Sequence, residues 1–194
     1  MSNHIDFYFD IISPYSYLAH KKIEKIREKK KIKFNYKPIL LGGLHNLAEI
    51  NPPAFNKYKM QNMQSDCELV SNKNNISFTW NSKFPISTLP IMRGCLLVNE
   101  NKKEIYLNTF FDAYWKNNID LSSENEILKL LKILQINNVI FFKGIKEQRI
   151  KDHLKDLTND AFRKEVFGAP TFVVNNKIFW GQDRLEYALD ELKC

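Results

Sequence analysis

Three short segments place polar residues where a strand is expected to meet a helix or a turn. In the first, D-x-x-S-P-Y-S-Y over residues 10–17, Ser13 follows an alternating apolar stretch and precedes a proline. A serine at this position caps a helix, and the free N–H groups of the helix N-terminus also stabilise an anion. Ser13 is therefore either only an N-cap or a group that donates a hydrogen bond to an anion such as a ligand's thiolate.

The second segment, F-G-A-P-T-F over residues 167–172, sets a proline directly before an expected strand. Pro170 is a candidate for a cis peptide bond, which normally has a structural purpose. The backbone N–H and C=O of Ala169 could then pair with an extended peptide as a short added strand. The alternative is a trans proline that begins an edge strand.

The third segment, F-W-G-Q-D-R-L over residues 179–185, is another strand-to-helix turn. Gln182 and Asp183 stand where side chains and backbone amides could hold the charged amino-acid end of a ligand, although Asp183 could also serve only as a cap. Each segment is a weak signal alone. We expect all three at the same end of one sheet, and their combination favours a binding site.

The elements around the first segment form a strand, helix, strand unit. Apolar residues alternate over residues 5–9, and Pro14 suits the first position of a helix. Helical spacing continues through positions 15, 18, 19, 22, 23 and 26, where Lys22 is the one residue that is not apolar. A second alternating stretch spans residues 32–38. Such a unit implies parallel strands.

Helical signals dominate the middle of the chain. The spacing predicts helices near residues 56–74, 87–100, 104–117, 123–135 and 147–164. A hairpin is expected next, with Asn175 and Asn176 at the turn between strands 171–174 and 178–180. A last helix is expected from about Gln182.

The ends are thus β-α-β and β-β-α, with an all-helical middle. This order resembles an α/β, thioredoxin-like fold that a large all-helical insertion domain interrupts after the second strand. We expect the thioredoxin-like domain to comprise residues 1–41 and 166–194, and the insertion domain residues 42–165.

Composition excludes several classes of function. The chain has 194 residues and a net charge of +7, but its basic residues are spread over the whole length, so no nucleic-acid site is indicated. Neither a secretion signal nor a membrane-spanning apolar run is present, and we expect a cytoplasmic protein. The three cysteines, Cys67, Cys95 and Cys194, are far apart, and the histidines lack ligand spacing. We therefore predict neither disulfides nor a metal site.

The three motifs, in this order, resemble the 2-hydroxychromene-2-carboxylate isomerase family, which is close to kappa-class glutathione transferases within the wider DsbA-like group. The resemblance covers essentially the whole chain. Asn51 lies in a loop similar to the family's Asn-x-x-Pro loop, and residues 84–89 resemble its F-P-x-N-T-L element. Ser87 stands where the family usually has Asn, so we expect a different acceptor pocket.

The resemblance implies glutathione as the bound thiol and a role for several residues. Ser13 matches the serine that contacts the glutathione sulfur. The other matched positions are Ala169 and Pro170 for the cysteinyl backbone, Gln182 and Asp183 for the γ-glutamyl group, Asn51 as a loop contact, and Lys59, with Lys57 as the alternative, for the glycyl carboxylate.

The implied activity is a glutathione-dependent isomerisation by a homodimer. Glutathione thiolate adds to a conjugated carbonyl compound of aromatic type, rotation follows, and elimination gives the other isomer. The first alternative is a kappa-class-like glutathione transferase or peroxidase. A disulfide oxidoreductase is disfavoured because Ser13 replaces the essential thiol. A non-catalytic binding module for acidic ligands or nucleic acid remains a lower alternative.

Overall fold

The computed structural model describes residues 4–29 and 32–193, so Cys194 lies outside the described residues. In the described part the elements follow one another as β1 (His4–Phe9), α1 (Pro14–Lys29), β2 (Lys33–Pro38), α2 (Leu41–Leu47), η1 (Pro53–Phe55), α3 (Lys57–Lys73), α4 (Leu89–Leu97), α5 (Glu100–Trp115), α6 (Glu124–Ile133), α7 (Asn138–Gly144), α8 (Gln148–Arg163), β3 (Thr171–Val174), β4 (Lys177–Trp180), η2 (Gln182–Arg184) and α9 (Leu185–Lys193).

The strands form one sheet in the order β2-β1-β3-β4. β1 runs parallel to β2 and antiparallel to β3, and β3 pairs with β4 as a hairpin. Asn175 and Asn176, at the hairpin turn, have positive φ angles of 48° and 62°, which suit asparagine in such a turn. The expected β-α-β and β-β-α ends are confirmed.

Different helices cover the two faces of the sheet. Phe7 and Phe9 on one face belong to the main core, which α1, α5 and α9 help to build. On the other face Tyr8 packs with Leu44 of α2 and Ala161 of α8. The alternation of β1 therefore reflects burial on both faces rather than a solvent-exposed side.

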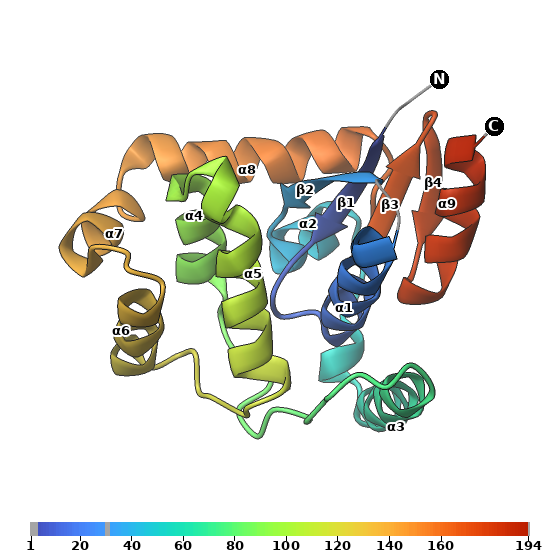
Figure 1. Cartoon of the computed structure of the whole chain (residues 1–194), viewed down its shortest axis with the longest axis horizontal. Coiled ribbons are helices and arrows are strands. Elements are labelled where there is room, and N and C mark those ends of the chain that lie inside the picture. Colours follow the sequence, from blue (N-terminus) through green and yellow to red (C-terminus); the bar gives the residue numbers. More distant parts are fainter. Residues whose placement is uncertain (1–3, 30–31, 194) are drawn as a thin grey trace.

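Of the remaining helices, α4, α6 and α7 lie on one side of the sheet, with α6 and α7 farthest from it, whereas α3 lies below α1 (Figure 1). Five predicted helices correspond to α3, α4, α5, α6 and α8. The sequence pattern predicts neither α2 nor α7, because each has only seven residues and shows too little of a helical period. Trp115 of α5 is fully buried, and its indole Nε1–H donates to the carbonyl of Ile11 at 2.8 Å. The core thus continues across the expected domain boundary, and the division into two domains stays a prediction.

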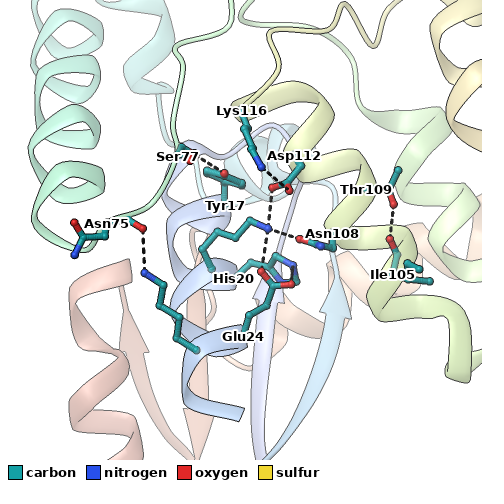
Figure 2. Close-up of polar contacts among 12 residues, drawn as sticks. Tyr17, His20, Glu24, Asn75, Ser77, Ile105, Asn108, Thr109, Asp112 and Lys116 are labelled. Carbon is teal, nitrogen blue, oxygen red and sulfur yellow. Dashed lines mark hydrogen bonds and ion pairs between the residues drawn. The ribbon is translucent and has the colours of Figure 1, made fainter. Parts of the chain in front are cut away.

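A polar network fixes α1 against α5 and the loop after α3 (Figure 2). The Lys21 ammonium donates to the carboxylate of Glu24 at 2.9 Å and forms an ion pair with Asp112 Oδ1 at 2.8 Å. One turn earlier, the Tyr17 hydroxyl donates to the carbonyl of Ser77 at 2.6 Å. Because Tyr17 and Lys21 both lie on α1, the network holds the helix whose N-terminus carries Ser13.

His20, which precedes Lys21 on α1, is fully buried. Its ring stacks on Phe111 with centroids 5.1 Å apart, and its Nδ1 lies 3.2 Å from the hydroxyl of Tyr36. Burial, reinforced by the nearby positive charge of Lys21, lowers the pKa of His20 from 6.5 to about 3. The imidazole is therefore neutral in the folded protein at ordinary pH.

Acid should consequently destabilise the protein in part through His20. Between a pH of 6.5 and about 3 the unfolded chain protonates this residue but the folded chain does not, so stability falls as pH falls. His20 alone contributes at most about 1.4 kcal/mol per pH unit to this slope. We expect His20→Phe to flatten it, as measured by urea unfolding at about pH 7, 5.5 and 4.

The exposed His153 of α8 offers a matched control. His153→Gln should keep the wild-type slope. If His20→Phe and the wild type lose stability in parallel between these pH values, the buried neutral imidazole is not a source of acid sensitivity.

Candidate functional site

Ser13 lies at the junction between β1 and α1 and is 4% exposed. Its hydroxyl oxygen accepts a hydrogen bond from the backbone N–H of Ser16 at 3.1 Å, which is the geometry of an N-cap. The same hydroxyl donates to the carbonyl oxygen of Ala169 at 2.9 Å. Ser13 therefore caps α1 and also joins the first predicted segment to the second.

The second segment has the expected cis peptide bond between Ala169 and Pro170. The carbonyl of Pro170 accepts from the backbone N–H of Gly181 at 3.0 Å, which connects this segment to the third. The Thr171 hydroxyl donates to the carbonyl of Gly168 at 2.7 Å and holds the turn from inside. Two hydrogen bonds therefore link all three segments at one end of the sheet.

The third segment turns sharply at Gly181, whose φ of 114° is a conformation that residues with a side chain rarely adopt. A Cβ atom there would lie 2.5 Å from Asp183 Oδ1, but this carboxylate ends an exposed side chain that can move aside, so the φ angle is what favours glycine. Gln182 is 8% exposed, whereas Asp183 is exposed and forms an ion pair with Arg184 at 3.2 Å. Of the two residues predicted to hold the charged end of a ligand, Asp183 is therefore accessible to solvent, whereas Gln182 is largely buried.

Sequence reasoning missed Lys22, which contacts Gln182 in the third segment. The Lys22 ammonium lies 3.4 Å from the backbone carbonyl oxygen of Gln182 and donates to the side-chain Oε1 of the same residue. The signal that could have found it is its place as the one charged residue in the apolar spacing of α1.

A groove of about 430 Å³ lies beside the N-terminal end of α1. Its lining residues are Tyr15, Pro53, Tyr58, Lys59, Asn62 and Met63. Lys59 thus lines the same groove as Tyr15, two residues after Ser13, whereas Lys57 is not a lining residue. Asn51 is exposed in the loop before η1 and does not line the groove either.

Tyr15 connects this groove to α3. Its hydroxyl donates to Asp66 Oδ2 at 2.8 Å. Burial and this hydrogen bond raise the pKa of Tyr15 well above its ordinary value. The hydroxyl therefore stays protonated at ordinary pH and acts as a donor, with no role as a base.

Sequence reasoning also missed the pair that holds the loop before Ser13. Asp10 is 1% exposed, and its carboxylate accepts from the backbone N–H groups of Ile12 at 3.1 Å and Leu41 at 2.8 Å. It also accepts from the Thr88 hydroxyl at 2.7 Å. Burial raises the pKa of Asp10, and these hydrogen bonds oppose that shift. Thr88 belongs to the segment around Ser87, which is itself exposed.

The cysteines do not offer a competing nucleophile in the described part of the chain. Cys67 and Cys95 are buried and free of disulfides, and burial raises the pKa of both thiols, that of Cys95 to about 12. Among the described residues, no group of three or more His, Cys, Asp or Glu side chains is arranged to hold a metal ion. No helix of residues 4–29 and 32–193 combines the length and apolar character needed to cross a bilayer.

Thr88→Val tests whether the hydrogen bond from Thr88 to Asp10 stabilises the loop before Ser13. The substitution keeps the shape but removes a donor from a buried carboxylate, so we expect a loss of about 1.5–3 kcal/mol in the free energy of unfolding. Urea denaturation at neutral pH measures it. The exposed Thr79 provides the control, and an equally small loss for Thr79→Val and Thr88→Val would contradict the assignment.

Comparison with curated proteins found relatives of two kinds. Among curated proteins, the chain is 26% identical to a 2-hydroxychromene-2-carboxylate isomerase from Sphingobium xenophagum, over 96% of each chain. It is 28% identical to glutathione S-transferase kappa 1 from Caenorhabditis elegans, over 97% of this chain and 90% of the relative.

Solved structures share the fold. A 2-hydroxychromene-2-carboxylate isomerase superposes with a TM-score of 0.88 at 24% identity, covering 97% of this chain and 95% of that one. The cytosolic disulfide reductase DsbM from Pseudomonas aeruginosa, determined with GSH, superposes with a TM-score of 0.67 at 12% identity, covering 98% and 96%. The predicted thioredoxin-like fold of DsbA type is therefore confirmed.

A family model covers nearly the whole described chain. Residues 4–193 match the DSBA-like thioredoxin domain. The match includes the helices between β2 and β3 as well as the four strands. The chain therefore belongs to the DSBA-like thioredoxin domain family.

Proposed function

We propose that the protein binds glutathione with its sulfur at Ser13 and uses the bound thiolate to isomerise a conjugated carbonyl compound of the 2-hydroxychromene-2-carboxylate type. The observation that carries this proposal is the hydrogen bond from the Ser13 hydroxyl to the Ala169 carbonyl. It sets a hydroxyl at the N-terminus of a 16-residue helix beside the backbone that precedes a cis proline. Relatives named as isomerases and as kappa glutathione transferases support the same class of chemistry.

Binding would proceed by an exchange of hydrogen bonds. The cysteinyl N–H of glutathione replaces the Ser13 hydroxyl as the donor to the carbonyl of Ala169. The Ser13 proton then turns to the sulfur, while the Ser13 oxygen still accepts from the N–H of Ser16. The helix N-terminus adds its partial positive charge, so the thiolate is favoured over the thiol.

The outer parts of glutathione would lie on either side of Ser13. Gln182 and Asp183 hold the γ-glutamyl end. Lys59 pairs with the glycyl carboxylate at the groove it shares with Tyr15, which favours Lys59 over Lys57. Asn51 is an additional contact, one that requires the exposed loop before η1 to meet the ligand.

The chemical step needs no oxidant or reductant. In a 2-hydroxychromene-2-carboxylate the hemiketal ring first opens: the ring C–O bond breaks, the hydroxyl proton passes to the phenolic oxygen, and a conjugated ketone results. The thiolate then forms a C–S bond to the β-carbon of this ketone, and the electron pair of the C=C bond moves to the carbonyl oxygen. Rotation about the resulting single bond follows, and the returning electron pair breaks the C–S bond and releases the thiolate. A hydrogen bond to the charged sulfur contributes about 1.5–3 kcal/mol, or one to two decades in thiolate population.

A kappa-type transferase is the second candidate, and the 28% identity to a kappa 1 transferase favours it specifically. It shares the thiol site and differs in releasing the glutathione conjugate. A disulfide oxidoreductase would need a thiol at position 13, where this chain has serine. A homodimer and a cytoplasmic location stay predictions.

Ser13→Ala tests the proposal. The substitution removes the donor to the sulfur, so we expect the rate of 2-hydroxychromene-2-carboxylate isomerisation at saturating glutathione to fall by about one to two decades. Loss of the cap also costs about 1 kcal/mol, which circular dichroism and urea unfolding control. The exposed Ser65 gives the matched variant, Ser65→Ala, with wild-type activity expected.

Two results would decide against the proposal. A wild-type rate in Ser13→Ala would remove Ser13 from the chemistry. Formation of a stable glutathione conjugate, with no isomer released, would favour the transferase. Mass spectrometry of the products distinguishes the two activities.

A further inference from the structure

Lys22 occupies an unusual position in the apolar spacing of α1. It lies nine residues after Ser13, is half-buried, and directs its ammonium to Gln182. The same ammonium lies 3.4 Å from the backbone carbonyl of Gln182, so one cation meets both oxygens of one residue. No other part of the proposed chemistry requires a charge at this point of the helix.

This contact decides which edge of the Gln182 amide remains for a ligand. An ammonium group has only donors, so the amide oxygen must face Lys22 and the NH₂ group must point away from it. Gln182 is 8% exposed, so its side chain cannot swing out into solvent, and the contact with Lys22 fixes which way its amide faces. The remaining edge therefore offers N–H donors, which suit a carboxylate and repel an ammonium group.

Asp183, the next residue, favours a ligand group of the opposite charge. Asp183 is exposed and carries a carboxylate, which can accept from an ammonium group. Asp183 is close enough to Lys22 to raise the pKa of that lysine, although burial, the larger effect, lowers it. A donor edge and an anionic acceptor thus stand side by side at one corner of the site.

We propose that Lys22 is a specificity-determining residue, which turns the amide of Gln182 so that the Gln182–Asp183 corner selects a free α-amino-acid end. Gln182 and the field of Lys22 receive the α-carboxylate, and Asp183 receives the α-ammonium group. The inference rests on the proposed function, because it assumes that the γ-glutamyl end of glutathione lies at this corner. Lys22 acts through Gln182 and has no role in the step at sulfur.

Calorimetry with three tripeptides tests the proposal. The ligands are glutathione, an analogue without the α-carboxylate (4-aminobutanoyl-Cys-Gly) and an analogue without the α-amino group (glutaryl-Cys-Gly). For the wild type we expect loss of the carboxylate to weaken binding about tenfold or more, as for a charge-assisted hydrogen bond.

Lys22→Met should change only one of these comparisons. Without the ammonium the Gln182 amide turns freely, so the penalty for the missing carboxylate should fall below about threefold, while the penalty for the missing amino group stays as in the wild type. Lys22→Arg, which again has only donors, should restore the carboxylate penalty. Lys25→Met is the control, because exposed Lys25 donates to the carbonyls of Asn74 and Asn75 instead.

The outcomes separate the two proposals. An equal loss for all three ligands in Lys22→Met, or no change, would contradict the role of Lys22 while leaving the glutathione site intact. Failure of the wild-type protein to bind glutathione would overturn the proposed function and this inference together. Circular dichroism checks the fold, and Lys22→Gln, whose amide imposes no single polarity, replaces Lys22→Met if that variant does not fold.

Discussion

The hydrogen bond between the Ser13 hydroxyl and the Ala169 carbonyl connects residues 156 positions apart in the chain. It depends on β1 and β3 being neighbours in the sheet, since Ser13 follows β1 and Ala169 precedes β3. A serine in this place cannot exchange disulfides, but it can cap a helix and donate a proton at the same point. The two roles do not compete, because a hydroxyl both accepts and donates.

Much of the molecule maintains that geometry. Asp10 and Thr88 hold the loop before Ser13, and the indole of Trp115 binds the Ile11 carbonyl in the same loop. The network around Lys21 then fixes α1 against α5 (Figure 2). Helices that lie between β2 and β3 in sequence therefore support the site, although its three motifs lie at the two ends of the chain.

The sequence predicts most of the fold because its signals are local. Alternation in β1, the Asn175–Asn176 turn and the serine–proline start of α1 each act over a few residues. The missed features depend on contacts over long distances or on very short elements. Nothing near Thr88 indicates that its hydroxyl meets Asp10, 78 positions earlier, and the two turns of α7 contain too few residues to show a period. Lys22 was visible as an exception to the apolar spacing of α1, but its partner was not.

The central claim is that Ser13 and the N-terminus of α1 stabilise the thiolate of bound glutathione. The direct measurement is the pH titration of thiolate absorbance near 240 nm for glutathione held by excess wild-type protein, against the protein alone. We predict a midpoint about one to two pH units below that of free glutathione. A midpoint equal to that of the free thiol, with binding verified in the same samples, would contradict the account.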